Sequence, residues 1–264
     1  MKQVFRNFAK AALKKFNIAV IKYSTFQRYF ENMGAVQQSE LHRIEVLLAL
    51  PNRHASQLLK LLRKSKAQFG QDLFVLSELE FKRNGFFIEF GATDGVMFSN
   101  TYLLEKEFGW TGILAEPAKS FHQDLANTDR NCHIETDCVW RESNLTLTFN
   151  EAGAFSTVDS HSSINLRKGR KKGKVYNVNT ISLLDLCKKY NAPNQIDFLS
   201  IGTEGSEFEI LSTFDFDKYQ VKVITCEHNY TKEREKTFSL LTEKGYVRKF
   251  EKLSLYDDWY VKAE

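Results

Sequence analysis

From Gln68 onward, short apolar runs alternate with segments in which apolar residues recur at helical spacing. This alternation is typical of parallel β-strands joined by crossover helices. We predict strands at 86–90, 112–116, 133–139, 196–201, 221–226, 246–253 and 259–262, and helices at 101–108, 119–127, 182–190, 206–214 and 233–244. The pattern therefore predicts an α/β domain with a mostly parallel, seven-stranded sheet.

The last two predicted strands are separated only by a short turn around Tyr256 and Asp257. A parallel connection needs a crossover of about a dozen residues, so these strands must pair in the antiparallel sense. A parallel sheet that ends in an antiparallel hairpin is typical of nucleoside-dependent methyltransferases. A dehydrogenase usually continues into a separate substrate domain.

The segment before residue 67 follows a different pattern. Apolar positions at helical spacing (Phe5, Phe8, Ala12 and Phe16) lie beside a basic strip (Lys2, Arg6, Lys10 and Lys14). Such a helix either lies on an anionic membrane surface, through residues 1–30, or packs its phenylalanine face on the domain or on a second subunit. A further helical zone at 39–66 is interrupted by Pro51. We therefore divide the chain into a basic helical extension, 1–66, and a second domain, 67–264.

Composition supports this division. Residues 1–66 carry 13 Lys/Arg against 3 acids, whereas residues 67–264 carry 24 against 30. The second domain is therefore mildly acidic, which argues against a nucleic-acid-binding body. No apolar stretch is long enough to span a membrane, and the start lacks the pattern of a secretory signal. We expect a cytoplasmic protein, with peripheral membrane attachment as the alternative, and four reduced, structural cysteines.

A glycine loop follows the first predicted strand in the segment FFIEFGATDGVMFSN. In a doubly wound sheet, this loop normally holds the nucleotide. Its spacing, Gly91-x-x-x-Gly95, differs from the G-x-G-x-x-G that binds a pyrophosphate, and Glu89 and Asp94 make it acidic. The loop therefore disfavours a nicotinamide-dependent oxidoreductase and suits a cationic ligand without phosphate, such as S-adenosylmethionine. The alternative is an ordinary strand-to-helix turn.

The next two strands end in acidic residues as well. Glu116 ends the second strand 25 positions after Gly91, where a carboxylate accepts hydrogen bonds from both ribose hydroxyls. At the end of the third strand, Asp137 is a candidate for the adenine amino group and the Cys138 backbone for the ring. An aspartate at the surface, with no role in binding, is the alternative for Asp137.

Two segments, FFIEFGATDGVMFSNTYLLEKEFGWTGILAEP and IDFLSIGTEGSEFEIL, together with the closing DDWYVK, resemble the FkbM-type S-adenosylmethionine-dependent methyltransferases. The resemblance covers about 68–262. It implies a Rossmann-like class I methyltransferase fold and methyl transfer to an oxygen, commonly a hydroxyl of a sugar or of a glycosylated or polyketide product. It also implies cofactor contacts at Glu89, Gly91, Asp94, Ser99, Asn100 and Glu116.

The chain departs from this family at one position. The fourth-strand motif usually has an aspartate two positions before its Glu-Gly pair, and here that position is Gly202. The remaining Glu204 and Gly205 keep the strand end recognisable. The leading hypothesis is an O-methyltransferase for a sugar, polysaccharide or glycolipid precursor. The alternative is a catalytically weak nucleoside-binding module that has lost turnover through Gly202.

Transfer of a methyl group to an alcohol also requires a group that accepts the hydroxyl proton. The fifth strand ends in ITCEHNY, which makes His228 the candidate general base and Glu204 the candidate for orienting it or the acceptor. The alternative is a histidine that only closes a loop. A divalent metal site of Glu204, Glu227 and His228 is the less favoured alternative, because it has few ligands.

The run RKGRKKGK, 167–174, carries six positive charges in eight residues. Its density of charge and its glycines are typical of a solvated loop. The functional alternative is a lid that attracts an anionic acceptor to the pocket. RNA is disfavoured, because no aromatic residues are interleaved for base stacking.

Overall fold

The computed structural model describes residues 35–153, 156–158 and 173–263. Arg43–Glu264 forms one compact unit. The residues of the predicted Phe5 to Phe16 face and most of the basic run at 167–174 lie outside the described residues. The division of the chain at residue 67 stays a prediction. Among the described helices, none is both long and apolar enough to cross a membrane.

A seven-stranded sheet forms the centre of the domain, in the order β10-β11-β9-β8-β1-β2-β3. Its strands are β1 (Phe86–Phe90), β2 (Thr111–Ala115), β3 (His133–Glu135), β8 (Gln195–Ile201), β9 (Gln220–Glu227), β10 (Tyr246–Lys249) and β11 (Asp257–Lys262). Strands β3, β2, β1, β8 and β9 pair in parallel, whereas β11 pairs antiparallel with both β9 and β10. The predicted mostly parallel sheet with an antiparallel C-terminal strand is confirmed.

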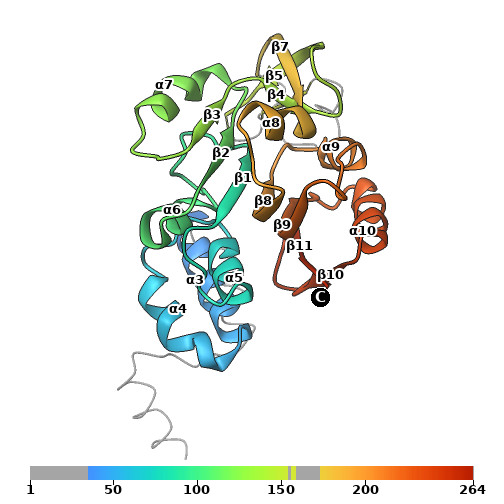
Figure 1. The fold of residues 1–264 in the computed structure, drawn as a ribbon. Helices are drawn as coiled ribbons and strands as arrows, with labels where there is room; N and C mark the ends of the chain where they lie inside the picture. The colour runs from blue at the N-terminus through green and yellow to red at the C-terminus, as the bar shows by residue number, and fades with distance from the viewer. Residues whose placement is uncertain (1–34, 154–155, 159–172, 264) are drawn as a thin grey trace, which may run out of the picture. The chain divides into compact units, whose positions relative to one another are not determined.

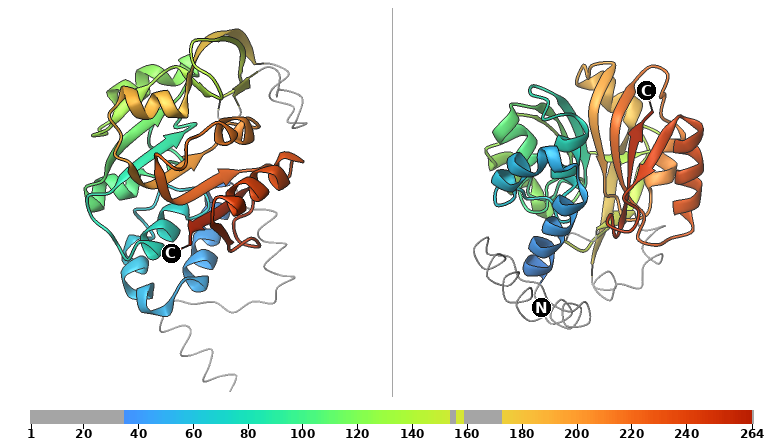
Figure 2. Two further views of the ribbon diagram at one scale, coloured as in Figure 1. Left: turned by 45° about the vertical axis from the view of Figure 1, so that its right-hand side comes forward. Right: turned by 90° about the horizontal axis from the view of Figure 1, so that it is seen from below.

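Helices cover both faces of this sheet, as Figures 1 and 2 show. One apolar cluster contains residues of α5 (Gln71–Glu78), α6 (Tyr102–Phe108) and α7 (Lys119–Asn127), and the other contains residues of α8 (Leu183–Lys189), α9 (Glu207–Ser212) and α10 (Glu233–Glu243). Successive side chains of a strand point to opposite faces. Phe87 of β1 therefore lies in the first cluster and Ile88 in the second. This three-layer arrangement is the predicted Rossmann-like fold.

The predicted strand at 133–139 is wrong, because the chain divides there into two strands of different sheets. The Glu135 side chain accepts hydrogen bonds from the backbone N–H groups of Thr136 and Asp137, at 2.9 and 3.0 Å, and so ends β3. The chain then enters β4 (Cys138–Trp140) of a second sheet, ordered β4-β7-β5-β6, which lies at the top of Figure 1. Its other strands are β5 (Thr146–Glu151), β6 (Thr157–Val158) and β7 (Lys174–Ser182).

Two further differences concern helices and strand length. Helix α5 is absent from the sequence prediction because Gln71–Ser77 is buried on all sides, so its apolar residues show no helical stripe. The strand predicted at 246–253 ends at Lys249, where a turn begins. The predicted break at Pro51 is confirmed: α3 (Ala35–Ala49) ends before it, and the short 3₁₀-helix η1 (Asn52–His54) and α4 (Ala55–Leu61) follow.

Candidate functional site

A pocket opens at the carboxyl ends of β1, β2 and β8, which is the edge where parallel α/β sheets bind ligands. From these strands and the loops after them come Phe90, Gly91, Thr93, Ala115, Glu116, Pro117, Gly202, Thr203 and Ser206. The second sheet and its loops add Cys138, Val139, Phe149, Gly153, Ser156, Thr157 and Val158. The space between these residues, counted together with the solvent at its open mouth, is about 530 Å³.

The β1 and β8 strands approach each other closely at the floor of the pocket. Gly91 has φ +71°, and a Cβ at this position would lie 2.1 Å from the carbonyl oxygen of Gly202. No side chain fits there, so Gly91 lets the backbone of the loop pass over the end of β8. Gly202 itself differs: a Cβ there would meet only the Phe90 carbonyl oxygen, at 3.8 Å. The position therefore has room for a side chain.

The Glu89 side chain does not line the pocket and instead accepts hydrogen bonds from the loop after β1. Its carboxylate accepts hydrogen bonds from the Asn100 N–H, at 2.7 Å, from the Ser99 hydroxyl, at 2.9 Å, and from the Thr101 hydroxyl. The fully buried guanidinium of Arg130 donates to the hydroxyls of Ser99 and Thr101 at 3.2 and 2.8 Å. Three of the predicted cofactor residues, Glu89, Ser99 and Asn100, therefore shape the loop in this structure and are absent from the pocket lining.

Asp94 also has a role within the loop. Its carboxylate accepts hydrogen bonds from the backbone N–H groups of Val96 and Met97, at 2.9 and 2.7 Å, as turn-forming aspartates do. It does not line the pocket. Its predicted cofactor contact stays a prediction.

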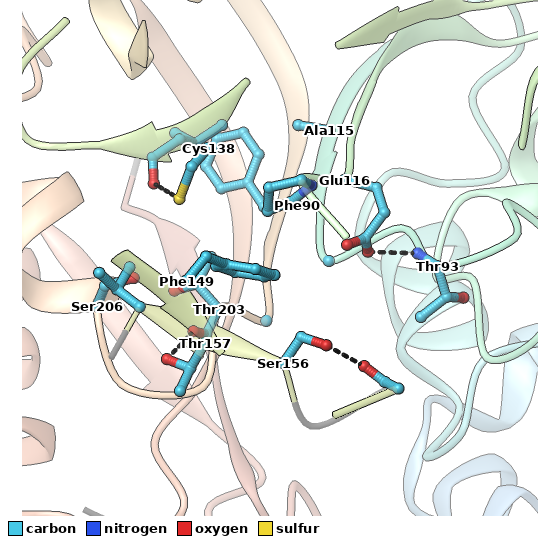
Figure 3. A pocket seen from close by; sticks show the side chains of 16 residues that line it. Phe90, Thr93, Ala115, Glu116, Cys138, Phe149, Ser156, Thr157, Thr203 and Ser206 are labelled. Carbon is cyan, nitrogen blue, oxygen red and sulfur yellow. Dashed lines mark hydrogen bonds between the residues drawn. The ribbon is translucent and has the colours of Figure 1, made fainter. Parts of the chain in front are cut away.

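Glu116 lines the pocket at the end of β2, where the sequence predicts it. Its carboxylate accepts hydrogen bonds from the backbone N–H groups of Thr93 and Ala118, both at 2.9 Å. Figure 3 shows this carboxylate beside Thr93, facing Phe149, Thr157 and Thr203 across the pocket. Burial raises the pKa of Glu116 to about 7, against an ordinary 4.5. Each carboxylate oxygen has a second lone pair, so both can still accept hydrogen bonds from a ligand.

The end of the third strand contributes Cys138, which lines the pocket, but not Asp137. Asp137 is half-buried, and its backbone N–H donates to Glu135. Burial raises the pKa of the Cys138 thiol to about 12, so this cysteine is a neutral apolar wall and not a nucleophile. All four cysteines are free, in agreement with the sequence prediction.

The second sheet forms a wall that the sequence analysis did not identify. Phe149 of β5 and Val158 of β6 line the pocket, and the Thr157 hydroxyl donates to the carbonyl oxygens of Thr203 and Glu204, at 3.3 and 3.2 Å. A signal was present in the sequence, because Leu145, Leu147 and Phe149 alternate with polar residues, the period of a half-buried strand.

Carboxyl groups gather beyond the ends of β8 and β9. Glu204 is 5% exposed, and the Asn229 side chain donates to its Oε2 at 3.2 Å. Burial and the neighbouring carboxyl groups, first Glu204 and then Glu207 and Asp257, raise the pKa of Glu227 well above its ordinary value. Burial raises the pKa values of Glu207 and Asp257 to about 7. Glu207, Glu227 and Asp257 therefore keep their protons to higher pH than carboxyl groups in water do, and each is a stronger base when ionised.

His228, the predicted general base, lies in a second hollow together with Glu207, Glu227 and Asp258. Its Nδ1 accepts a hydrogen bond from the Tyr230 N–H at 2.9 Å, so the ring proton is on Nε2. Nε2 lies 3.9 Å from Asp258 and has no hydrogen-bond partner within the described ranges. Burial lowers the pKa of His228 and keeps the ring neutral. To accept a proton, His228 must first release the Tyr230 contact.

Metal binding was the less favoured alternative for Glu204, Glu227 and His228. In the part of the chain that the structure describes, no group of three or more His, Cys, Asp or Glu side chains has an arrangement that could hold a metal ion. The contacts of these three residues are instead with Asn229, with neighbouring carboxyl groups and with the Tyr230 N–H.

Comparisons with known proteins place this geometry in context. Residues 89–256 match the family model of the methyltransferase FkbM domain. A search of curated proteins finds no match. Among solved structures, precorrin-6y C5,15-methyltransferase from Geobacter metallireducens GS-15 is 14% identical, with a TM-score of 0.37 over 67% of this chain and 71% of that chain. The fibrillarin/Nop5p complex gives 11% identity and a TM-score of 0.35, over 75% of this chain and 81% of that chain.

Proposed function

The chain belongs to the FkbM methyltransferase family, and from this premise we propose that it transfers a methyl group to a hydroxyl oxygen of a sugar, polysaccharide or glycolipid precursor. The observation that carries the proposal is the buried Glu116 carboxylate in a pocket whose floor is the contact between Gly91 and Gly202. Such a pocket at the carboxyl ends of β1 and β2 fits a nucleoside whose ribose hydroxyls donate to Glu116.

The residues of the pocket fit S-adenosylmethionine. Glu116 can accept from the ribose, and the apolar side chains of Val139 and Phe149, with the neutral Cys138 thiol, suit the flat base. The bare backbone at Gly202, where a Cβ would meet no atom closer than 3.8 Å, leaves space for the cationic tail. The cofactor supplies an electrophilic methyl group on a sulfonium when bound. Glu116 and the apolar wall of Val139 and Phe149 would hold it at the carboxyl ends of β1 and β2.

The acidic groups beyond β8 and β9 suit an acceptor that is rich in hydroxyls. Carboxylates accept hydrogen bonds from hydroxyl groups, and Glu204 and Glu227 lie at the strand ends that follow the pocket. We assign the acceptance of the hydroxyl proton to this group of carboxylates, with Glu204 as the orienting residue. His228 contributes as a base only in a conformation in which the Tyr230 N–H has moved away from Nδ1.

The first prediction tests this function directly. Purified protein is expected to bind S-adenosylhomocysteine in isothermal titration calorimetry, and to transfer a tritiated methyl group from S-adenosylmethionine to members of a glycan and glycolipid panel. Transfer only to proteins, nucleic acids or amines contradicts the proposed acceptor class. Binding without transfer to any acceptor favours the alternative, a nucleoside-binding module without turnover.

The second prediction concerns Gly202, at the position where the family usually has an aspartate. We expect Gly202→Asp to raise kcat by about tenfold, because a carboxylate there would help to position the acceptor, and a Cβ at this position meets no atom closer than 3.8 Å. The control is Gly202→Asn, which has the same shape but no charge. An unchanged kcat in the aspartate variant, with normal folding, contradicts the assigned role of the missing carboxylate.

A further inference from the structure

Large aliphatic side chains are exposed on the helices before the sheet. Leu48 of α3 is 74% exposed, Leu59 of α4 is 63% exposed, and Ile44, one helical turn before Leu48, is 41% exposed. Neighbouring apolar residues of the same two helices, Val46, Leu47, Leu58 and Leu61, are buried in the core, as is Leu50 directly after α3. The core face of each helix is therefore already occupied, and Ile44, Leu48 and Leu59 lie on the solvent side of their helices.

Positively charged residues follow Leu59 in the chain. Lys60, Arg63 and Lys66 are exposed, and none of them forms an ion pair with another described residue. Two further cations are neutralised: Arg53 pairs with Glu80 at 2.5 Å, and Lys64 pairs with Glu107 at 2.6 Å. Exposed leucines next to unpaired lysine and arginine are the combination that binds proteins to anionic lipid surfaces.

We propose that Ile44 and Leu48 of α3, Leu59 and Lys60 of α4, and Arg63 and Lys66, which follow α4, together form a docking surface for an anionic phospholipid bilayer. The aliphatic side chains would enter the boundary between headgroups and acyl chains, and the cations would contact lipid phosphates. Neither signal alone gives stable attachment, whereas an apolar and a basic signal together do.

Charge complementarity selects a bilayer over other occupants. In a symmetric dimer formed through this surface, each copy would place its cations near the same cations of its partner, which is repulsive. A nucleic acid would satisfy the charge but would leave the leucines in water, because bases stack on aromatic side chains and not on aliphatic ones. Residues 1–30, which precede α3 in the sequence, contain seven Lys/Arg and no acid.

The surface is also separate from the catalytic pocket. Helix α4 lies at the lower end of the domain in Figure 1, whereas the second sheet, which forms a wall of the pocket, lies at the upper end. Substitutions on the surface should therefore leave cofactor binding intact, and docking can be tested independently of the proposed methyl transfer.

The test is sedimentation of the full-length protein with sucrose-loaded vesicles, of phosphatidylcholine alone or with about one third phosphatidylglycerol. We expect binding to the anionic vesicles, with an affinity that falls as salt concentration rises. The double variant Leu48→Glu/Leu59→Glu and the triple variant Lys60→Glu/Arg63→Glu/Lys66→Glu should each bind about tenfold more weakly.

Matched controls are Val247→Glu, at a valine that is 51% exposed on β10, and Lys252→Glu, at an exposed lysine in the turn after β10. Both should bind vesicles like the wild type, and circular dichroism should show that every variant is folded. Wild-type binding by the double and triple variants overturns the proposal, as does failure of the full chain to bind anionic vesicles. If the wild type self-associates without lipid and the double variant does not, the surface binds a second copy of the chain, and the proposal is overturned as well.

Discussion

Replacement of Gly91 with alanine is expected to abolish S-adenosylhomocysteine binding and to lower the free energy of unfolding by roughly 3 kcal/mol. The new Cβ would lie 2.1 Å from the Gly202 carbonyl oxygen, and the alanine would have to adopt φ +71°, which favours glycine. The ends of β1 and β8 would have to separate, and this contact is the floor of the pocket. Urea unfolding and calorimetric titration measure the two effects.

Gly202→Ala is the matched control, because it adds the same methyl group to the other side of the same contact. Its Cβ would meet only the Phe90 carbonyl oxygen, at 3.8 Å. We expect its stability to differ from the wild type by less than about 1 kcal/mol. If both variants unfold at the same urea concentration, the close approach of Gly91 to the Gly202 carbonyl oxygen does not exclude a side chain at position 91, and the prediction is wrong.

Glu116→Gln is expected to weaken S-adenosylhomocysteine binding by about 100-fold, equivalent to about 2.7 kcal/mol. The amide keeps the size of the side chain but replaces one acceptor oxygen with a donor. That donor would face either the N–H of Thr93 or the N–H of Ala118, each of which now donates to a carboxylate oxygen at 2.9 Å. A buried donor without an acceptor is costly, and a ribose hydroxyl would lose its partner as well.

Asp124→Asn is the control for Glu116→Gln. Asp124 is an exposed acid on α7, the helix that follows Glu116 in the chain, so its substitution removes a negative charge without touching the pocket. Calorimetric titration should give an affinity within about twofold of the wild type. An equal loss of affinity in both variants means that net charge, and not the carboxylate in the pocket, controls binding.

The raised pKa of Glu116 gives this binding a pH dependence. Between about pH 4.5 and pH 7 the folded protein keeps a proton on Glu116 that the unfolded chain releases, so this group's contribution to stability falls as pH rises through that window.

Ligand hydroxyls donate more strongly to the ionised carboxylate. Affinity for S-adenosylhomocysteine should therefore rise between pH 6 and pH 8, around the pKa of about 7, and the rise should be absent in Glu116→Gln.

Single residues show how far the site was predictable. Gly91 and Glu116 follow directly after strands, and Cys138 begins β4. The sequence predicts all three as cofactor contacts, and all three line the pocket. For Glu89 and Asp94 the sequence predicts where each residue lies but not which way its side chain points. Their carboxylates could turn to the ligand or to the loop's own N–H and hydroxyl groups, and here they contact the loop. A choice between such partners depends on three-dimensional geometry.

The sequence by itself determined the central sheet, its antiparallel end and the glycine and acidic residues at its carboxyl edge. These depend on local signals: the period of apolar residues, turn residues, and the fact that parallel strands end at one edge. Only the tertiary structure decided that the chain leaves the first sheet at Thr136, that a second sheet walls the pocket, and that Nδ1 of His228 is occupied. The second sheet depends on pairing between distant residues, such as Cys138 with Thr180, which the alternation at 145–149 does not reveal. The contacts at Glu135 and His228 are between near neighbours, but the sequence pattern does not say which of several possible local turns the backbone adopts.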